Sequence, residues 1–200
     1  MKYIGITQSV NIDHDRGVRT DTLDQRWVAF IRACGLTPLL LPNDRTAVQQ
    51  LTAALPIAGI LLTGGNTLAA YGGDAPERDE MEFWLVEEAA RGGIPILGVC
   101  RGMQVIQHLH GVPLCRVSGH VEPRQVITVD GAEQTVNSYH NWGTTETRRP
   151  LDVWAVAADG VVKAVRHGPG LLAVMWHPER LEPFRTRDLT MFRDHFEGGR

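Results

Sequence analysis

A cysteine between two glycines, at a turn from strand to helix, is the first group in the chain with an evident chemical use. In the stretch GVCRG, Cys100 follows an apolar run at 94–97 and precedes a segment of helical character at 103–110. Glycines at 98 and 102 let neighbouring backbone approach closely, as a nucleophile elbow requires. A helix N-terminus favours a thiolate over a thiol, and its amides can hold a developing oxyanion. The turn alone does not separate this nucleophile from a buried, inert cysteine.

A histidine and a glutamate elsewhere in the chain supply the partners that a cysteine nucleophile needs. His177 directly follows an apolar strand predicted at 171–176, and Glu179 stands two residues further on. An imidazole can take up and return protons, and a carboxylate can orient it. We therefore predict that Cys100, His177 and Glu179 form a catalytic set, with a plain loop histidine as the alternative. The histidines without a partner at mechanistic spacing are His14, His120, His167 and His195, while His108 and His110 lie on the predicted helix after the elbow.

These groups need a scaffold, and the chain alternates short strand patterns with helical ones. Strands are predicted at 3–7, 37–41, 57–63 and 94–99, and helices at 22–33, 44–55, from Pro76 to about 92 and at 101–109. After Gly111 the pattern changes to short strands at 114–117, 125–129, 135–139, 153–157, 161–165 and 171–176, with a closing helix at 183–196. We expect an α/β fold: a doubly wound, mostly parallel central sheet with helices on both faces and a small antiparallel β extension. Cys100 then lies at the carboxyl end of a strand, where open α/β sheets bind ligands.

Composition narrows the class of protein. Two hundred residues fit one domain, which we place at 1–200. The 20 Lys and Arg residues against 23 Asp and Glu, with no long basic run, indicate no nucleic-acid partner and no membrane-surface patch. The chain opens on a strand pattern rather than an apolar leader, so we expect a cytoplasmic protein. Three scattered cysteines without CxxC spacing predict neither a disulfide framework nor a structural metal site.

Several motifs together resemble the class I glutamine amidotransferase superfamily, in its γ-glutamyl hydrolase (peptidase C26-like) branch. GVCRGMQ resembles the family's nucleophile elbow, MWHPE its His and Glu pair, LLTGGN its oxyanion-strand motif and VNSYHNWG its substrate-side motif. ERDEMEFWLV is similar to an Arg-Asp segment of the branch, and DGVVKAV to a hairpin before the His motif. The matches run in family order from residue 3 to about 180.

The resemblance implies a role for each matching residue. Cys100 would be the nucleophile, His177 the general acid and base, and Glu179 its orienter. Backbone N–H groups of Gly64, Gly65 and Arg101 would form the oxyanion hole, and a strand ending in two glycines independently favours such donors. The residues implied to hold the α-amino and α-carboxylate groups of a γ-glutamyl substrate are Gln104, Asn137, Ser138 and His140. Ser138 and His140 are two apart on one strand face, although strand-end capping would explain this polar cluster as well.

The implied reaction is cysteine-dependent hydrolysis of a γ-glutamyl amide through a thioester, with glutamate and an amine as products and no metal or organic cofactor. Within the branch, NSYHNWG is most similar to hydrolases of γ-glutamyl-CDP-amidate, which release cytidine diphosphoramidate for the decoration of surface polysaccharide. The alternatives are a γ-glutamyl-γ-aminobutyrate-type hydrolase, a glutaminase subunit with a synthetase partner, and a non-catalytic sensor; homo-oligomerisation stays open. A diphosphate leaving group would need cationic partners, and the candidates are Arg16, Arg19, Arg101, Arg116, His120 and Arg124.

Overall fold

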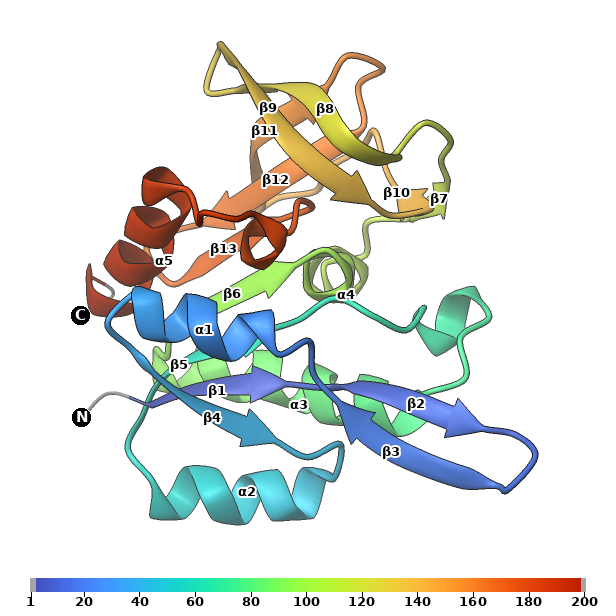
Figure 1. Ribbon diagram of the computed structural model, residues 1–200, viewed down its shortest axis with the longest axis vertical. Helices are drawn as coiled ribbons and strands as arrows, with labels where there is room; N and C mark the ends of the chain where they lie inside the picture. Colours follow the sequence, from blue (N-terminus) through green and yellow to red (C-terminus); the bar gives the residue numbers. More distant parts are fainter. Residues whose placement is uncertain (1–2, 199–200) are drawn as a thin grey trace.

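A nine-stranded sheet is the frame of this computed structural model, which describes residues 3–198. Its order is β4-β1-β5-β6-β13-β12-β11-β8-β9 (Figure 1). The parallel strands are β4 (Thr37–Leu41), β1 (Tyr3–Thr7), β5 (Ile57–Leu62), β6 (Ile96–Val99) and β13 (Leu171–Val174). The antiparallel strands are β12 (Val162–His167), β11 (Asp152–Ala157), β8 (Val121–Val129) and β9 (Ala132–Tyr139). The predicted fold class is confirmed, and the antiparallel part is larger than expected because it continues the central sheet.

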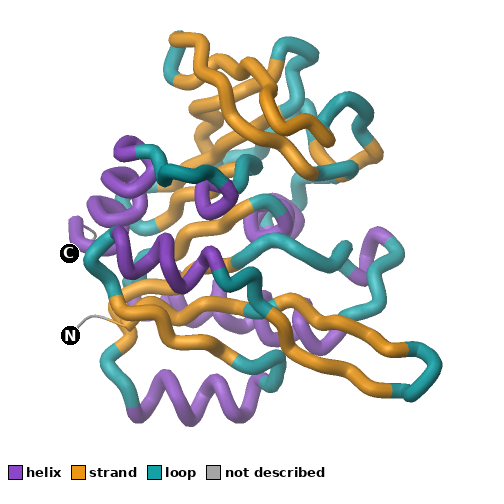
Figure 2. The backbone as a smooth tube through the Cα atoms, in the orientation of Figure 1, coloured by secondary structure: helices purple, strands orange, loops and turns teal. Residues whose placement is uncertain are grey.

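Helices cover both faces of the parallel half (Figure 2). On one face lie α1 (Arg26–Ala33) and α5 (Thr186–Gly198), where Phe30 and Phe192 meet edge to face at 4.9 Å between ring centroids. The other face carries α2 (Arg45–Ala54), α3 (Pro76–Gly92) and α4 (Arg101–Leu109), with Met103 and Leu85 in its core. Burial of these apolar side chains on both sides explains why the parallel strands read as continuous apolar runs.

A β-hairpin that the sequence did not reveal precedes the first helix. Strands β2 (Ser9–Asp13) and β3 (Val18–Thr22) pair and project from the sheet, so the helix predicted from residue 22 begins only at Arg26 (Figure 1). Every residue of β3 is exposed, so the segment lacks the apolar alternation by which a strand is recognised. A second small sheet joins β7 (Cys115–Arg116) to β10 (Trp142–Gly143).

Other boundaries move by a few residues from those predicted. The strand expected at 94–99 begins at Ile96, the one expected at 171–176 ends at Val174, and the closing helix runs over 186–198 rather than 183–196. Two short 3-10 helices, η1 (Ala69–Tyr71) and η2 (Pro178–Arg180), lie in segments that had no assignment. None of the helices within residues 3–198 combines the length and apolar character that a bilayer crossing requires.

The topology brings the predicted site residues to one edge of the sheet. Strands β5, β6 and β13 are neighbours and run parallel, so their carboxyl ends meet. Gly64, Cys100 and His177 follow these three ends within a few residues. Residues far apart in the chain therefore converge where open α/β sheets bind their ligands.

Candidate active site

Cys100 occupies a strained turn that only small neighbours permit. It precedes α4 with φ 53° and ψ −103°, which a non-glycine residue rarely adopts. A Cβ at Gly98 would lie 2.7 Å from the backbone of Gly102, and a Cβ at Gly102 would lie 2.3 Å from the carbonyl oxygen of Leu62. The two glycines are thus required by close backbone approach, as expected for an elbow that turns the sulfur out of the strand direction.

The His177 imidazole is held between a carboxylate and a buried amide. Its Nδ1 lies 2.7 Å from Oε1 of Glu179, and both side chains are buried. The Asn137 side chain donates to the backbone carbonyl of His177 at 2.8 Å and accepts from its backbone N–H at 2.7 Å. Both polar atoms of that amide are therefore used to fix the loop that carries the imidazole.

Cys100 and His177 interact directly, and their protonation is coupled. Burial disfavours the Cys100 thiolate, but the charge of His177 and hydrogen bonds from its imidazole and from the Arg101 backbone N–H outweigh burial, so the pKa of Cys100 falls below its usual value. Burial also lowers the pKa of His177, yet the charge of Cys100 and hydrogen bonds with Cys100 and Glu179 raise that pKa to about 9. The arrangement favours a thiolate–imidazolium pair.

The two glycines after β5 lie against this pair. A Cβ on Gly64 would lie 2.8 Å from Cε1 of His177 and 3.6 Å from Cβ of Cys100. Gly65 has φ +118°, and a Cβ there would lie 2.7 Å from the side chain of Ser9. Gly64 therefore lies against both side chains, and Gly65 borders a cavity together with Cys100. That the N–H groups of Gly64, Gly65 and Arg101 form an oxyanion hole stays a prediction.

Beneath the glycines, a buried guanidinium holds the backbone. Nη2 of Arg78 donates at 2.9 Å to the carbonyl oxygens of both Thr63 and Gly64, and its Nε donates to Glu82 at 2.9 Å. Arg78 is fully buried. Arg78 lies within the ERDEMEFWLV stretch, but the sequence gave no signal of this role. The two carbonyl oxygens that its guanidinium binds belong to a distant part of the chain.

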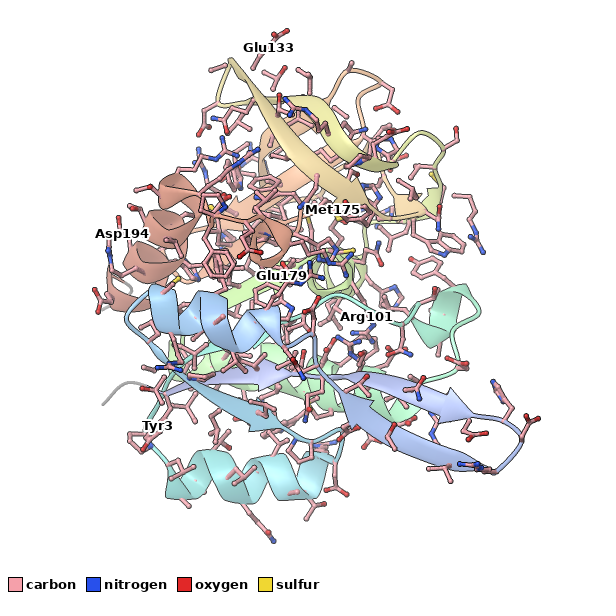
Figure 3. All side chains as sticks on the ribbon, viewed as in Figure 1. Tyr3, Arg101, Glu133, Met175, Glu179 and Asp194 are labelled. Carbon is pink, nitrogen blue, oxygen red and sulfur yellow. The ribbon has the colours of Figure 1, made fainter. Side chains whose placement is uncertain are left out.

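The side chain of Arg101 belongs to the same buried network. It forms ion pairs with Asp79 and Glu82, and the interior position of Arg101 is visible in Figure 3. The hypothesis that this guanidinium contacts a diphosphate leaving group is therefore wrong, because both carboxylates already occupy it. The same correction applies to His120, which is buried, pairs with Asp159 at 3.0 Å and stacks on His140.

Two cavities flank the Cys100–His177 pair, and Gly65 lines both. The sulfur-side cavity, of about 130 Å³, is bordered by Gly65, Cys100, Gln104, Arg116, His140 and Trp142. The imidazole-side cavity, of about 80 Å³, is bordered by Asp24, Gly64, Gly65, His177, Glu179 and Arg180. If the amide bond of a substrate lay at Gly65, the group on one side of its carbonyl would enter the cavity beside the sulfur, and the group on the other side would enter the cavity beside the imidazole.

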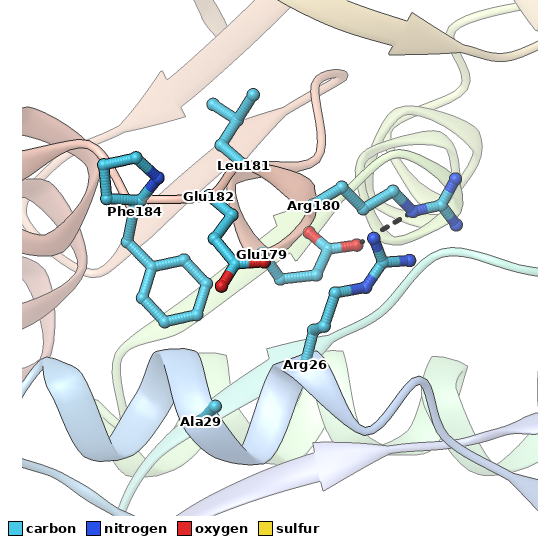
Figure 4. A pocket seen from close by; sticks show the side chains of 8 residues that line it. Arg26, Ala29, Glu179, Arg180, Leu181, Glu182 and Phe184 are labelled. Atoms are coloured by element: carbon cyan, nitrogen blue, oxygen red, sulfur yellow. Dashed lines mark ion pairs between the residues drawn. The ribbon is translucent and has the colours of Figure 1, made fainter.

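A larger outer cavity of about 430 Å³ adjoins the imidazole-side cavity through Glu179 and Arg180 (Figure 4). Arg180 and Arg26 lie side by side there, with Phe184 across the cavity. Nε of Arg180 is 3.4 Å from Oε1 of Glu179, while Arg26 pairs with Asp24. Neither arginine was among the predicted candidates.

The predicted substrate residues divide into two groups. Gln104 and His140 line the sulfur-side cavity. Asn137 and Ser138 do not border it, since the first holds the His177 backbone and the second donates to the His120 carbonyl at 2.9 Å. Direct contact of Asn137 and Ser138 with substrate stays a prediction to which this packing gives no support.

A buried lysine, which the sequence analysis quoted within DGVVKAV without assigning it a role, completes the polar wall. Nζ of Lys163 lies 2.9 Å from Oγ of Ser138 and 2.7 Å from Nε2 of His140. Burial lowers the pKa of Lys163 to about 8 despite the charges of Asp159 and Cys100. Within residues 3–198 no three His, Cys, Asp or Glu side chains gather so as to hold a metal ion.

Comparisons with known proteins bear on the family and the fold of this chain. The Peptidase C26 family model matches residues 2–128 and 118–179. A Campylobacter jejuni γ-glutamyl-CDP-amidate hydrolase is 30% identical over 89% of this chain and 90% of its own length. An Escherichia coli γ-glutamyl-γ-aminobutyrate hydrolase is 27% identical over 92% of this chain and 87% of its own.

Two further matches differ in what they show. The name of one Mycobacterium tuberculosis protein places it with the glutamine amidotransferases. That protein is 31% identical to this chain; the match covers 82% of this chain and 63% of the length of that relative. The solved glutamine amidotransferase of Thermotoga maritima has a TM-score of 0.69 at 16% identity and covers 98% of this chain and 84% of its own, which is a likeness of fold. From the family model and the relatives together, the chain belongs to the Peptidase C26 family.

Proposed function

We propose that this protein hydrolyses γ-glutamyl amides through a thioester on Cys100. The observation that carries the proposal is the contact of a strained, helix-terminal thiol with an imidazole that is itself bonded to a buried carboxylate at 2.7 Å. The Cys100 thiolate attacks the side-chain carbonyl carbon, and the imidazolium of His177 protonates the leaving nitrogen as the C–N bond breaks. His177 then takes a proton from water, which attacks the thioester and releases glutamate while the thiolate re-forms.

The two cavities indicate how a substrate would lie. The leaving amine must be near the acid that protonates it, so it belongs in the imidazole-side cavity with His177. The glutamyl group stays on the sulfur and belongs in the sulfur-side cavity with Gln104. Gly65 borders both cavities, so we expect its backbone to lie beside the scissile carbonyl between them.

The position of Arg78 supports the proposed oxyanion hole. A trans peptide unit is planar and its N–H points opposite to its C=O. Because Arg78 binds the carbonyl oxygens of Thr63 and Gly64 on its own side, the N–H groups of Gly64 and Gly65 point away from Arg78. Together with the Arg101 N–H, which donates to the sulfur, they are suited to a developing oxyanion.

For the leaving group we propose a cytidine diphosphoramidate, so that the substrate is γ-glutamyl-CDP-amidate. Support comes from the Campylobacter relative and from Arg26 and Arg180, whose guanidinium groups border the outer cavity beyond the imidazole. Phe184 offers an aromatic surface on the opposite wall. The alternative substrate is γ-glutamyl-γ-aminobutyrate, favoured by the match to the Escherichia coli hydrolase.

The test measures glutamate release from γ-glutamyl-CDP-amidate, γ-glutamyl-γ-aminobutyrate and L-glutamine. Protein carrying Cys115→Ser is used because Cys115 is the exposed thiol. We expect release from a γ-glutamyl amide, a glutamyl adduct on Cys100 in rapidly quenched samples, and loss of both in Cys100→Ser. Glutamate release by the Cys100→Ser protein would contradict the mechanism. The substrate from which the parent protein releases glutamate fastest identifies the leaving group.

A further inference from the structure

We propose that Arg116 binds the α-carboxylate of the γ-glutamyl group in the sulfur-side cavity and so selects substrates by that charge. The inference rests on the proposed function and adds to it the group that reads the amino-acid end of the substrate. Arg116 was considered at the sequence level as a partner for the leaving group. Its cavity lies instead on the side of Cys100, where the acyl group remains after the leaving group has departed.

Charge singles out Arg116 among the described residues that line this cavity. His140 also borders it, but burial and the nearby charges of Lys163 and His120 lower the pKa of His140 to about 3, so its imidazole is neutral. Gln104 and Cys100 supply an amide and a thiolate. A carboxylate that enters the sulfur-side cavity therefore meets one side chain of permanent positive charge, the guanidinium of Arg116.

The imidazole of His140, which also borders the cavity, is already engaged. Nε2 of His140 lies 2.7 Å from Nζ of Lys163, and its Nδ1 lies 3.0 Å from the carbonyl oxygen of Trp142. Because an ammonium can only donate, Nε2 accepts and Nδ1 carries the proton that it donates to Trp142. Both ring nitrogens thus have partners, and the predicted role of His140 in holding substrate through its imidazole passes to a different residue.

The structure holds Arg116 in place without neutralising it. Its β7 strand pairs with β10, which sets Arg116 opposite Trp142, and its guanidinium carbon lies 4.7 Å from the centroid of the indole ring. Among the ion pairs of residues 3–198, Arg116 has no acidic partner, in contrast to arginines such as Arg78 and Arg101. A guanidinium stacked on an aromatic face keeps its N–H groups available for a bidentate contact with a carboxylate.

The Trp142 backbone is itself fixed by groups of the cavity wall. Its carbonyl oxygen accepts from Nε2 of Gln104 at 3.0 Å and from His140 at 3.0 Å. Gln104 lies on α4, four residues after Cys100. The ring on which the exposed Arg116 side chain stacks is therefore tied to the helix that carries the nucleophile at its start.

The experiment compares two anilides that differ at one group. γ-L-Glutamyl-p-nitroanilide carries the α-carboxylate, and 4-aminobutyryl-p-nitroanilide lacks it while keeping the amine and the scissile amide. We measure kcat/KM for both with the parent protein, Arg116→Gln, Arg116→Lys and the control Arg124→Gln, which removes an exposed arginine of β8. All carry Cys115→Ser.

We expect Arg116→Gln to lower kcat/KM for the glutamyl anilide by about 10- to 100-fold, the range of a charged hydrogen bond, and to leave the aminobutyryl anilide within about threefold. Arg116→Lys should recover part of the loss, and Arg124→Gln should change neither substrate. An equal loss on both anilides, or no loss on either, overturns the assignment of Arg116. If the parent protein cleaves no γ-glutamyl amide at all, the proposed function fails first and the assignment fails with it.

Discussion

Replacing Glu179 by glutamine should reduce the thiolate–imidazolium pair without changing the shape of the site. The carboxylate oxygen lies 2.7 Å from Nδ1 of His177, and the side chains are 1% and 3% exposed, so water cannot substitute for it. An amide oxygen can still accept from Nδ1–H, but it carries no negative charge. The change therefore removes the charge of Glu179 and keeps the hydrogen bond.

The size of the effect follows from that contact. A hydrogen bond to a charged group contributes about 1.5–3 kcal/mol, against about 1 kcal/mol for a neutral one. Since the neutral bond remains, the loss is the difference, about 0.5–2 kcal/mol. At about 1.36 kcal/mol per pKa unit, this lowers the pKa of His177 from about 9 by roughly 0.4 to 1.5 units. The ratio of ion pair to neutral pair then falls by about 2- to 30-fold.

The assay is the pH dependence of Cys100 alkylation by iodoacetamide, because only a thiolate reacts. Cys115→Ser removes the exposed thiol, and Cys34 is silent because burial raises its pKa to about 12. The parent protein should react at a lower pH than an ordinary thiol does, because the pKa of Cys100 is lowered, while Glu179→Gln should need a higher pH. Glu182→Gln, which removes an exposed carboxylate three residues further along the chain, is the control. An unchanged profile in Glu179→Gln would refute the electrostatic role of this carboxylate.

Three further outcomes follow from the same contacts. Gly64→Ala should lower kcat by about 100-fold, because its Cβ would meet Cε1 of His177 at 2.8 Å and displace the imidazole, whereas Gly170→Ala, with open space around it, should leave kcat unchanged. Arg78→Met should lower the free energy of unfolding in urea by about 3–5 kcal/mol, since Glu82 and two carbonyls lose a buried partner, and a change below about 1 kcal/mol would contradict this. Raising the pH through about 9 should lower both kcat/KM and stability, because the pKa of His177 is higher in the folded protein than in the unfolded chain. The stabilisation that protonated His177 gives is complete below the pKa of the unfolded chain, and it is lost as the pH rises through the pKa of the folded protein. A flat profile from pH 7 to 10 in both measurements would disprove that coupling.

The parallel half of the fold could be predicted because its signals are local. Strands buried on both faces read as apolar runs, and Pro76 at the start of α3 and Gly93 just after it, in the left-handed region with φ 63°, mark the ends of a helix. The β2–β3 hairpin could not be predicted from its composition, because β3 buries nothing: it is held by backbone hydrogen bonds to β2 and by polar contacts such as that of Arg19 with Glu77. Strands β11, β12 and β13 pair with their neighbours in the chain, but their attachment to β6 and to β8 joins strands that are distant in the chain, which no local pattern specifies.

The candidate site shows the same division between chemistry and surroundings. Cysteine, histidine and glutamate at strand ends could be recognised by type and position, and the structure brings them together. The partners of His140 could not be recognised from the sequence, because Lys163 lies on another strand and its amine reaches the imidazole only after the sheet has formed. A polar residue in a motif therefore predicts that a site is near, while its hydrogen-bond partners decide whether it faces substrate or the interior.

The buried charges beneath the site are best understood as a positioning device of helix α3. Replacing such a network by apolar residues often costs no stability, so stability alone does not explain two arginines and two acids in the interior. Through Arg78, α3 fixes the carbonyls of Thr63 and Gly64; through Asp79 and Glu82, it binds the side chain of Arg101, whose backbone N–H donates to the sulfur. The proposed oxyanion donors come from the end of β5 and the start of α4, which are about 36 residues apart in the chain and joined through α3. One rigid helix thus sets the spacing between both groups of donors, and a substitution in it should alter catalysis even where Cys100, His177 and Glu179 are intact.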